Sequence, residues 1–386
     1  MAQRRCITLT TLNNNITINK YTHCEGVFRM KNFEFPIEKT KTEGVTDAFK
    51  LDDPAERRTY FEAKAGVEIK KVKSYLEHNT FVAFLLGPKY SGKGTYSKLF
   101  GEIIGKEHVR HISVGDIVRD AYTKIKGENA DPKLAAFLEK NYRGFMPLDD
   151  AIEALLGKSQ AKLLPTELIL TLVEYEISQS GRKALFIDGF PRNLDQVAYA
   201  LYFGALMGYR DDPDFLVFID VPESVIDERI KFRVVCPKCH TPRNTKLLRT
   251  KDVTYDEDTQ TYHLICDDDD CEKAHLVGKE GDELGIEAIR DRIEVDKKVM
   301  GTLLELHGVP KIYLRNSIPV AKANKYVDDY EITPAYRYEN NTDKNEVTVI
   351  EEPWTIKDEN GEESYSLLPS PIVLSLIRQV ATVLKL

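Results

Sequence analysis

A glycine-rich segment between a buried strand and a helix constrains the fold of this chain more than any other feature. The segment reads GPKYSGKGT and spans residues 87–95, after the apolar run 81–87 and before the helical pattern 95–104. Glycines let backbone N–H groups close around a phosphate, and a helix N-terminus adds partial positive charge. This order of strand, loop and helix predicts a phosphate loop in which Lys93 reaches the outer phosphates of a ligand.

Short apolar runs alternate with helical patterns through the middle of the chain. Such an alternation predicts parallel strands joined by right-handed crossovers, with helices on both faces of one sheet. Sheets of this kind bind ligands at the carboxyl ends of their strands. The sequence places there the phosphate loop, the SVGD segment 113–116 and the DGFPR segment 188–192. The expected strands are 81–87, 108–114, 184–188, 214–221 and 311–316.

The composition excludes several classes of protein. The chain has 386 residues, of which 42% are hydrophobic and 30% are charged, so it is not disordered as a whole. A net charge of −8 disfavours a general nucleic-acid binder, although a local basic cleft is compatible with it. No apolar run approaches the roughly 18 residues that span a membrane. The N-terminus lacks the apolar core of a secretory signal. We therefore expect a cytoplasmic protein that has neither nucleic acid nor membrane as a partner.

The first 80 residues contain no motif that indicates a chemistry. Residues 1–29 are rich in Asn, Thr and Ile, and a more ordinary composition begins at Met30. This shift suggests the hypothesis that Met30 is the true start of translation. Further on, Asp53 and Pro54 favour the start of a helix, because Asp can cap it and Pro suits its first position. The apolar stripe of this helix consists of Phe61, Ala65, Ile69, Val72 and Leu76.

The segment after residue 316 also lacks a motif that indicates a chemistry. Residues 326–368 are polar and rich in tyrosine, and the turn sequence Glu359-Asn360-Gly361 predicts a hairpin. Residues 371–386 have the pattern of an amphipathic helix. These flanks can pack on the core, form a dimer or dock a partner, and the sequence leaves the three alternatives open.

Together with the segments that follow it, the phosphate loop resembles that of the adenylate kinase family of nucleoside monophosphate kinases. The resemblance covers residues 81–316 and rests on motifs that occur in the family's order. It implies an α/β fold of the P-loop type, with a five-stranded parallel sheet, helices on both faces, an inserted monophosphate-binding subdomain and a zinc-stabilised lid. Besides GKGT, the matching segments are SVGDIVR (113–119), KLLPTEL (162–168), DGFPRN with Gln196 (188–196), DERIKFR (227–233) and RDR (290–292).

The resemblance also implies which residues carry the chemistry. Phosphoryl transfer gathers negative charge, so catalysis depends on positioning and on groups that stabilise this charge. Arginine suits the task because its planar fork binds phosphate oxygens in pairs. The expected catalytic residues are Lys93, Arg192, Arg229, Arg233 and Arg292. The expected ATP-binding residues are Gly87, Ser91, Gly92, Lys93, Gly94, Thr95 and Arg229.

The same resemblance implies places for the monophosphate and for magnesium. Arg119 and Arg192 would hold the monophosphate, and Gln196 would hydrogen-bond the adenine edge. Asp188 and Asp116 would orient Mg²⁺ through water, which suits a hard cation that keeps much of its hydration shell. The expected AMP-binding residues are Val114, Gly115, Arg119, Leu164, Gly189, Arg192 and Gln196.

Three departures from the family's pattern bear on these roles. Val114 stands where the family has a threonine near the base, so one polar contact is missing. A further lid arginine of the family is replaced by Lys279, which either takes over its role with weaker bidentate geometry or leaves it unfilled. Residues 128–157 lengthen the monophosphate-binding part by two expected extra helices, which leaves the identity of the acceptor open.

Four of the six cysteines indicate a metal site. Without a route to an oxidising compartment, we interpret them as thiols or metal ligands and not as disulfides. Cys236 and Cys239 form a Cys-x₂-Cys half-site, in which two thiolates from one tight turn reach a tetrahedral Zn²⁺. Cys266 and Cys271 complete the expected set, with an Asp or a His in place of one of this pair as the alternative. A closed site of four ligands would be structural.

The expected activity is transfer of the γ-phosphoryl group of ATP to a nucleoside monophosphate, in the first place AMP, giving two ADP. We expect a monomer that uses Mg²⁺ with ATP and holds a structural Zn²⁺. The alternatives are UMP, CMP or GMP as the acceptor and, in another class, a catalytically inactive nucleotide-binding regulatory protein. The expected domains are an N-terminal extension (1–80), a kinase core (81–316) with a monophosphate-binding subdomain (115–183) and a lid (234–279), and a C-terminal extension (317–386).

Overall fold

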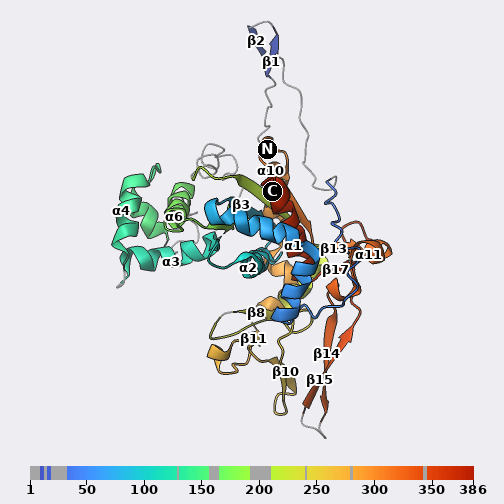
Figure 1. Cartoon of the computed structure of the whole chain (residues 1–386). Coiled ribbons are helices and arrows are strands. Elements are labelled where there is room, and N and C mark those ends of the chain that lie inside the picture. The colour runs from blue at the N-terminus through green and yellow to red at the C-terminus, as the bar shows by residue number, and fades with distance from the viewer. Residues whose placement is uncertain are drawn as a thin grey trace. The chain divides into compact units, whose positions relative to one another are not determined.

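The chain divides into two compact units, Met1–Glu34 and Phe35–Leu386 (Figure 1). In the first unit, β1 (Leu9–Leu12) and β2 (Asn15–Ile18) form an antiparallel hairpin. The expected division at residues 80 and 316 stays a prediction. The computed structural model describes the backbone of 9–12 and 15–18 and residues 33–127, 130–155, 165–191, 210–239, 241–278, 281–341 and 346–386.

Five parallel strands form the central sheet of the second unit, in the order β12-β6-β3-β5-β4. The register pairs Val82 of the central strand with Leu185 on one side and Asp214 on the other. This sheet confirms the five strands expected from the sequence. The strands are β3 (Val82–Leu86), β4 (Val109–Ser113), β5 (Ala184–Asp188), β6 (Asp214–Asp220) and β12 (Lys311–Arg315).

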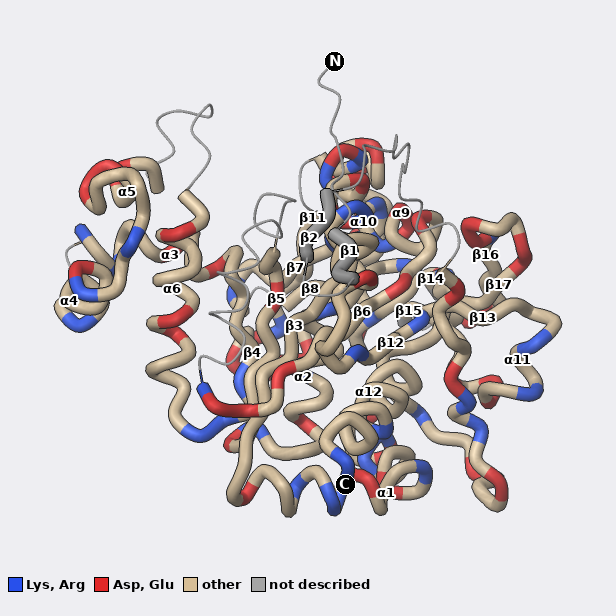
Figure 2. Tube along the Cα trace, turned by 90° about the horizontal axis from the view of Figure 1, so that it is seen from above, with Lys and Arg blue, Asp and Glu red and all other residues tan. Residues whose placement is uncertain are grey.

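Both faces of this sheet are covered. Ala83 and Leu85 share one hydrophobic core with residues of three helices, and Phe84, which points to the other face, is also fully buried. The three helices are α1 (Pro54–His78), α2 (Lys93–Ile104) and α12 (Pro369–Val383). Helix α12 packs against α1, α2 and β12, and Figure 2 shows it beside α1.

The predicted helix before the phosphate loop is confirmed as α1. Its cap residue Asp53 accepts hydrogen bonds at Oδ1 from the N–H groups of Ala55 at 2.8 Å and Glu56 at 3.0 Å. Because Pro54 has no N–H to leave unpaired, it fits the first helical position. All five residues of the expected apolar stripe are buried.

Four helices lie to one side of the sheet and share a small core of their own (Figure 2). Leu134 and Leu138 of the inserted segment pack in this core with Leu168 and Leu172. The two extra helices predicted for 128–157 are thereby confirmed. The group consists of α3 (Val114–Lys126), α4 (Pro132–Asn141), α5 (Leu148–Ala154) and α6 (Thr166–Ser178).

The lid is built from short strands between two helices. A three-stranded sheet has the order β11-β7-β8, and β9 pairs with β10 as a separate hairpin. The elements from the entering helix onward are α9 (Glu223–Lys231), β7 (Arg233–Val235), β8 (Pro242–Asn244), β9 (Val253–Asp256), β10 (Thr261–Leu264), the turn η2 (Asp269–Cys271), β11 (Val277–Gly278), the turn η3 (Asp282–Ile289) and α10 (Arg290–Leu304).

Along the chain, two hairpins follow the last strand of the central sheet and precede α12. The hairpin predicted around Asn360 is confirmed as β16 and β17, and β17 also pairs with β13. The β14–β15 hairpin was not predicted. It lies against the lid, where Tyr336 N–H donates to the carbonyl of Lys246 at 2.7 Å and Tyr338 Oη to that of Thr245 at 2.6 Å. The elements are β13 (Ser317–Pro319), α11 (Val320–Tyr326), the turn η4 (Asp329–Glu331), β14 (Ala335–Asn341), β15 (Glu346–Glu352), β16 (Ile356–Lys357) and β17 (Glu363–Ser366).

A buried ion cluster joins the segment before the sheet to the segment after it. Lys64 Nζ on α1 donates to Asp328 Oδ2 at 2.6 Å and to Glu331 Oε1 at 2.8 Å. Glu331 is fully buried and also accepts from Tyr60 Oη and Thr40 Oγ1, both at 2.6 Å. We call these five residues the flank cluster.

Within the described part of the chain, no helix combines the length and the apolar character that a membrane span requires.

Candidate functional site

The phosphate loop, Gly87–Thr95, leaves the carboxyl end of β3 and opens α2, as predicted. Lys93 lies in the first turn of α2, and its Nζ donates to the carbonyls of Gly87 and Pro88, both at 2.9 Å. Two glycines are required sterically. A Cβ on Gly87 would lie 2.7 Å from Ser91 Oγ, and Gly92 has a φ of +100°. The loop therefore has the local geometry of a phosphate cradle.

Two residues of the loop other than its glycines also bear on ligand binding. The buried Ser91 Oγ has no hydrogen-bond partner among the described residues, and a buried hydroxyl in that condition favours a ligand or a water nearby. Tyr90 has a φ of +67°, which is rare for a residue with a side chain. Backbone strain of this kind concentrates at functional sites. Sequence reasoning assigned Tyr90 no role.

The ends of β4 and β5 bring the expected acceptor side of the site to the phosphate loop. Asp188 at the end of β5 has a carboxylate oxygen 3.7 Å from Lys93 Nζ. Ser113 ends β4, and its Oγ caps α3 by accepting from Asp116 N–H at 3.3 Å. Arg119 and Asp116 are exposed and pair with each other at 2.8 Å. Asp188 therefore lies beside Lys93, and Asp116 and Arg119 lie on the helix that follows the neighbouring strand β4.

The smaller residues on this side have local structural reasons for their positions. Val114 is fully buried at the start of α3, so its position presents no polar group. Gly115 follows it in the first turn, and Gly189 after β5 has a φ of +88° that favours glycine. His111 on β4 has its Nδ1 2.8 Å from Ser97 Oγ. Burial lowers the pKa of this histidine, although the nearby Asp188 opposes the effect.

Two of the expected arginines meet the phosphate loop at Tyr90. Arg229 on α9 donates from Nη1 to the carbonyl of Tyr90 at 3.1 Å. The guanidinium of Arg233 lies over the Tyr90 ring, 4.8 Å from its centroid. Arg233 also forms a two-pronged ion pair with Asp282, at 2.7 Å and 2.9 Å. The lid entrance and the phosphate loop are thus joined through Tyr90.

The third expected arginine reaches the loop through an aspartate that sequence reasoning missed. Arg292 on α10 pairs with Asp296 Oδ1 at 2.7 Å, one helical turn further along. The other oxygen of Asp296 accepts from the backbone N–H of Lys89 in the phosphate loop at 3.1 Å. Burial raises the pKa of the Asp296 carboxyl, although Arg292 and Lys93 oppose this. The i, i+4 spacing of Arg292 and Asp296 was the available signal.

Some of the expected residues cannot be placed. The catalytic and AMP-binding Arg192, the AMP-binding Leu164 and Gln196, and Lys279 of the lid lie outside the residues that the structure describes. The same holds for Met30. Their expected roles stay predictions. Among the described ATP-binding residues, Gly94 lies near His111 and Thr95 is exposed on the first turn of α2.

The four predicted cysteines come together in the lid. One ligand atom from each of Cys236, Cys239, Cys266 and Cys271 lies within 4.8 Å of the others, and Cys239 Sγ is 3.6 Å from Cys266 Sγ. Tetrahedral zinc with Zn–S bonds of about 2.3 Å places its sulfurs about 3.8 Å apart, so the set fits a structural zinc. Hydrogen bonding with Thr241 lowers the pKa of the Cys239 thiol to about 6, whereas burial raises the pKa of the Cys266 and Cys271 thiols.

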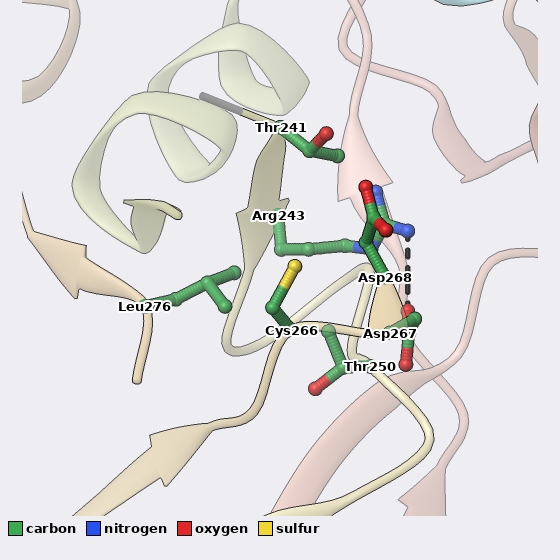
Figure 3. Close-up of a pocket in the computed structure, with 7 residues that line it drawn as sticks. All are labelled: Thr241, Arg243, Thr250, Cys266, Asp267, Asp268 and Leu276. Atoms are coloured by element: carbon green, nitrogen blue, oxygen red, sulfur yellow. Dashed lines mark hydrogen bonds and ion pairs between the residues drawn. The ribbon is translucent and has the colours of Figure 1, made fainter. Parts of the chain in front are cut away.

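A surface pocket of about 240 Å³ lies beside these cysteines (Figure 3). Arg243 crosses it to pair with Asp267 at 3.2 Å, and Cys266 also lines it. None of its lining residues belongs to the phosphate loop. The pocket is therefore a feature of the lid surface and separate from the expected nucleotide site.

The fold and the site together define a nucleotide-binding protein of the P-loop class, in which a parallel sheet carries the loop and the segments on either side of the lid supply arginines. No family model matches the chain. It is 32% identical over 211 residues to an adenylate kinase of Thermotoga petrophila, covering 54% of this chain and 77% of that protein. It is 31% identical over 231 residues to an adenylate kinase of Thermotoga neapolitana, covering 60% of this chain and 86% of the relative. An adenylate kinase of Clostridium novyi is 30% identical over 224 residues, covering 58% of this chain and 84% of that protein. The chain belongs to the adenylate kinase family.

Proposed function

We propose that the protein transfers the γ-phosphoryl group of ATP to AMP and so forms two molecules of ADP. The observation that carries this proposal is that Arg229 and Arg233 both contact Tyr90 of the phosphate loop, which also contains Lys93. A family relationship to proteins named adenylate kinases supports the choice of acceptor. Concentrated positive charge at one strand edge suits a reaction between two polyphosphates.

On the ATP side, the loop N–H groups and the start of α2 would bind the β- and γ-phosphates. Lys93 would exchange its contacts with the two loop carbonyls for phosphate oxygens. Arg229, Arg233 and Arg292 would stabilise the charge on the transferred group, with Arg233 releasing Asp282 as the lid closes. Gly87, Ser91, Gly92, Gly94 and Thr95 complete the proposed ATP-binding set.

On the AMP side, Arg119 and Arg192 would hold the phosphate and Gln196 the adenine edge. The exposed Arg119 would exchange its partner Asp116 for the phosphate. The proposed base pocket also includes Val114, Gly115, Leu164 and Gly189. Because Val114 is apolar, fewer polar groups discriminate between bases in this protein than in its family.

Two ions complete the proposal. Magnesium bound with ATP would neutralise phosphate charge, and Asp188 and Asp116 would orient it through water. The carboxylate of Asp188, 3.7 Å from Lys93 Nζ, offers the oxygen ligand that this cation prefers. The four lid cysteines would hold a structural zinc that stabilises the small lid core and takes no part in the chemistry.

A coupled assay with Mg²⁺, ATP and each of AMP, UMP, CMP and GMP tests the function. We expect the highest kcat/KM with AMP, and Lys93→Met should lower kcat by about a hundredfold or more because it removes a charge at the phosphates. The matched control is Lys98→Met, which removes an exposed lysine from the same helix. Faster turnover of another monophosphate would correct the acceptor. If none of the four monophosphates is turned over, the remaining interpretation is a catalytically inactive nucleotide-binding regulatory protein.

A further inference from the structure

We propose that Asn316, fixed by the C-terminal segment, is a positioning residue for Arg229 at the ATP phosphates. Asn316 follows the last strand of the sheet and is 1% exposed. Its Oδ1 accepts from Arg229 Nη2 at 3.3 Å and from Ser366 Oγ at 2.8 Å. The inference rests on the proposed function, because that function gives Arg229 its role.

The direction of the Asn316 amide is set by the C-terminal segment. Its Nδ2 donates to the carbonyl of Leu367 at 2.9 Å and to Tyr96 Oη at 3.3 Å. Because a backbone carbonyl can only accept, the NH₂ end of the amide must face Leu367. The oxygen end is then the one that faces Arg229, as a cation requires.

Arg229 is held from two sides by these contacts. Its Nη1 donates to the carbonyl of Tyr90 in the phosphate loop, and its Nη2 donates to Asn316. A guanidinium carries five N–H donors in one plane, so fixing two of its nitrogens orients the whole fork. Further donors remain for phosphate oxygens. An arginine oriented before the ligand arrives loses less side-chain entropy on binding.

The β16–β17 hairpin of the C-terminal segment also holds the start of α9, the helix that carries Arg229. Glu359 Oε1 accepts from the N–H of Glu223 at 2.9 Å, and Ser224 Oγ donates to the carbonyl of Lys357 at 3.0 Å. The cap residue Pro222 has no side-chain oxygen that could accept a hydrogen bond from the first N–H groups of α9, and the helix has no side-chain cap of its own. The β16–β17 hairpin therefore fixes α9 at its N-terminus and, through Asn316, at Arg229.

Two substitutions of different severity test the inference. Asn316→Ala removes the acceptor, and Ser366→Ala removes only the hydroxyl that supports it. We expect Asn316→Ala to raise KM for ATP about tenfold or more, because it removes a hydrogen bond to a charged group. Ser366→Ala should raise it about threefold, because it removes a hydrogen bond between neutral groups that acts on Arg229 only through Asn316. KM for AMP should stay within twofold, since Arg229 belongs to the ATP side. Thr355→Ala is the matched control, because it removes an exposed hydroxyl that bonds only within the same segment, to Glu363.

A double-mutant cycle separates positioning from a general loss of stability. In the Arg229→Ala background, Asn316→Ala should change KM for ATP less than twofold, since its target is gone. An undiminished effect in that background, or equal increases of both KM values, would overturn the inference. The binding of ATP alone, measured by titration calorimetry, gives the same comparison without turnover. A wild-type protein that binds ATP but forms no ADP would thus contradict the proposed function and still test the role of Asn316.

Discussion

The flank cluster places a lysine and a glutamate side by side where neither is accessible to water. Lys64 and Glu331 have fully buried side chains, and Glu331 accepts from Tyr60 and Thr40 as well. An ion pair in such a place adds little over an apolar pair, but the loss of one partner leaves an uncompensated charge. The cluster therefore makes the packing of the two flanks specific, because other arrangements would leave this carboxylate unpaired.

Lys64→Met is expected to lower the free energy of unfolding by about 3–5 kcal/mol, because it leaves Glu331 buried without its cation. Urea denaturation at pH 7 measures this change. Adding Glu331→Gln should recover part of the loss, since it removes the unpaired charge. Lys70→Met removes an exposed lysine from the same helix and is the control. Equal effects of Lys64→Met and Lys70→Met would contradict the prediction.

Single residues were predictable where their role is local to the sequence. Lys93 and the glycines of the phosphate loop lie within one short stretch of chain, and the structure places them between β3 and α2 as predicted, while their roles stay predictions. Asn316 could not be found, since its partners Arg229, Tyr96 and Ser366 are distant in sequence. Asp296 was missed because its contact with the loop depends on the packing of α10.

The small core of the lid contains its cysteines, and the β14–β15 hairpin packs against it. Tyr338 of β14 packs at the rim of the buried Cys236 and Cys271. The ring of Tyr338 also lies 5.6 Å from that of Tyr262 in the lid hairpin. A lid of this size needs a metal to fold stably on its own.

Purified protein is expected to contain one zinc per chain, and Cys271→Ser to contain less than half of that, because one of four thiolates is lost. Elemental analysis measures the zinc, and limited proteolysis at 241–278 reports whether the lid has opened. Glu257→Gln is the control, since this exposed residue of the β9–β10 turn lies in the lid but outside the four-cysteine set. Unchanged zinc in Cys271→Ser would contradict the assignment of this ligand.

Elements with a strong apolar pattern or a marked turn sequence were predictable, and the polar β14–β15 hairpin was not. The five sheet strands and α1 each carry a run or stripe of buried residues that the sequence displays directly. The β14–β15 hairpin carries no such pattern, because Tyr336 and Tyr338 are only partly buried and reach the lid through hydrogen bonds. Its register depends on a partner elsewhere in the chain.

At the scale of the whole molecule, the last helix completes the main core. The buried face of α12 packs against α1, α2 and β12. Each large apolar side chain buried there contributes about 1.5–3 kcal/mol, and the whole fold is stable by only about 5–15 kcal/mol. The residues concerned are Ile372, Val373, Leu374, Leu376, Ile377 and Val380.

A chain ending at Asn316 is therefore expected to lose cooperative unfolding, because α1 and α2 then expose their covered faces. A chain of residues 35–386 should keep its Tm within about 2 °C, since the main core lies entirely within it. Circular dichroism on heating measures both. A cooperative transition at the full-length Tm in the chain that ends at Asn316 would show that the C-terminal segment is dispensable for folding.

The contact between α1 and α12 also sets an order of events during synthesis. One helix ends at His78 and the other begins at Pro369, so translation at about 5–20 residues per second separates them by roughly 15–60 s. Throughout that interval the apolar stripe of α1 has no final partner, and neither has the face of α2 behind the phosphate loop. The main core is therefore complete only after α12 has been synthesised, and these two stripes are where a chaperone would bind the nascent protein.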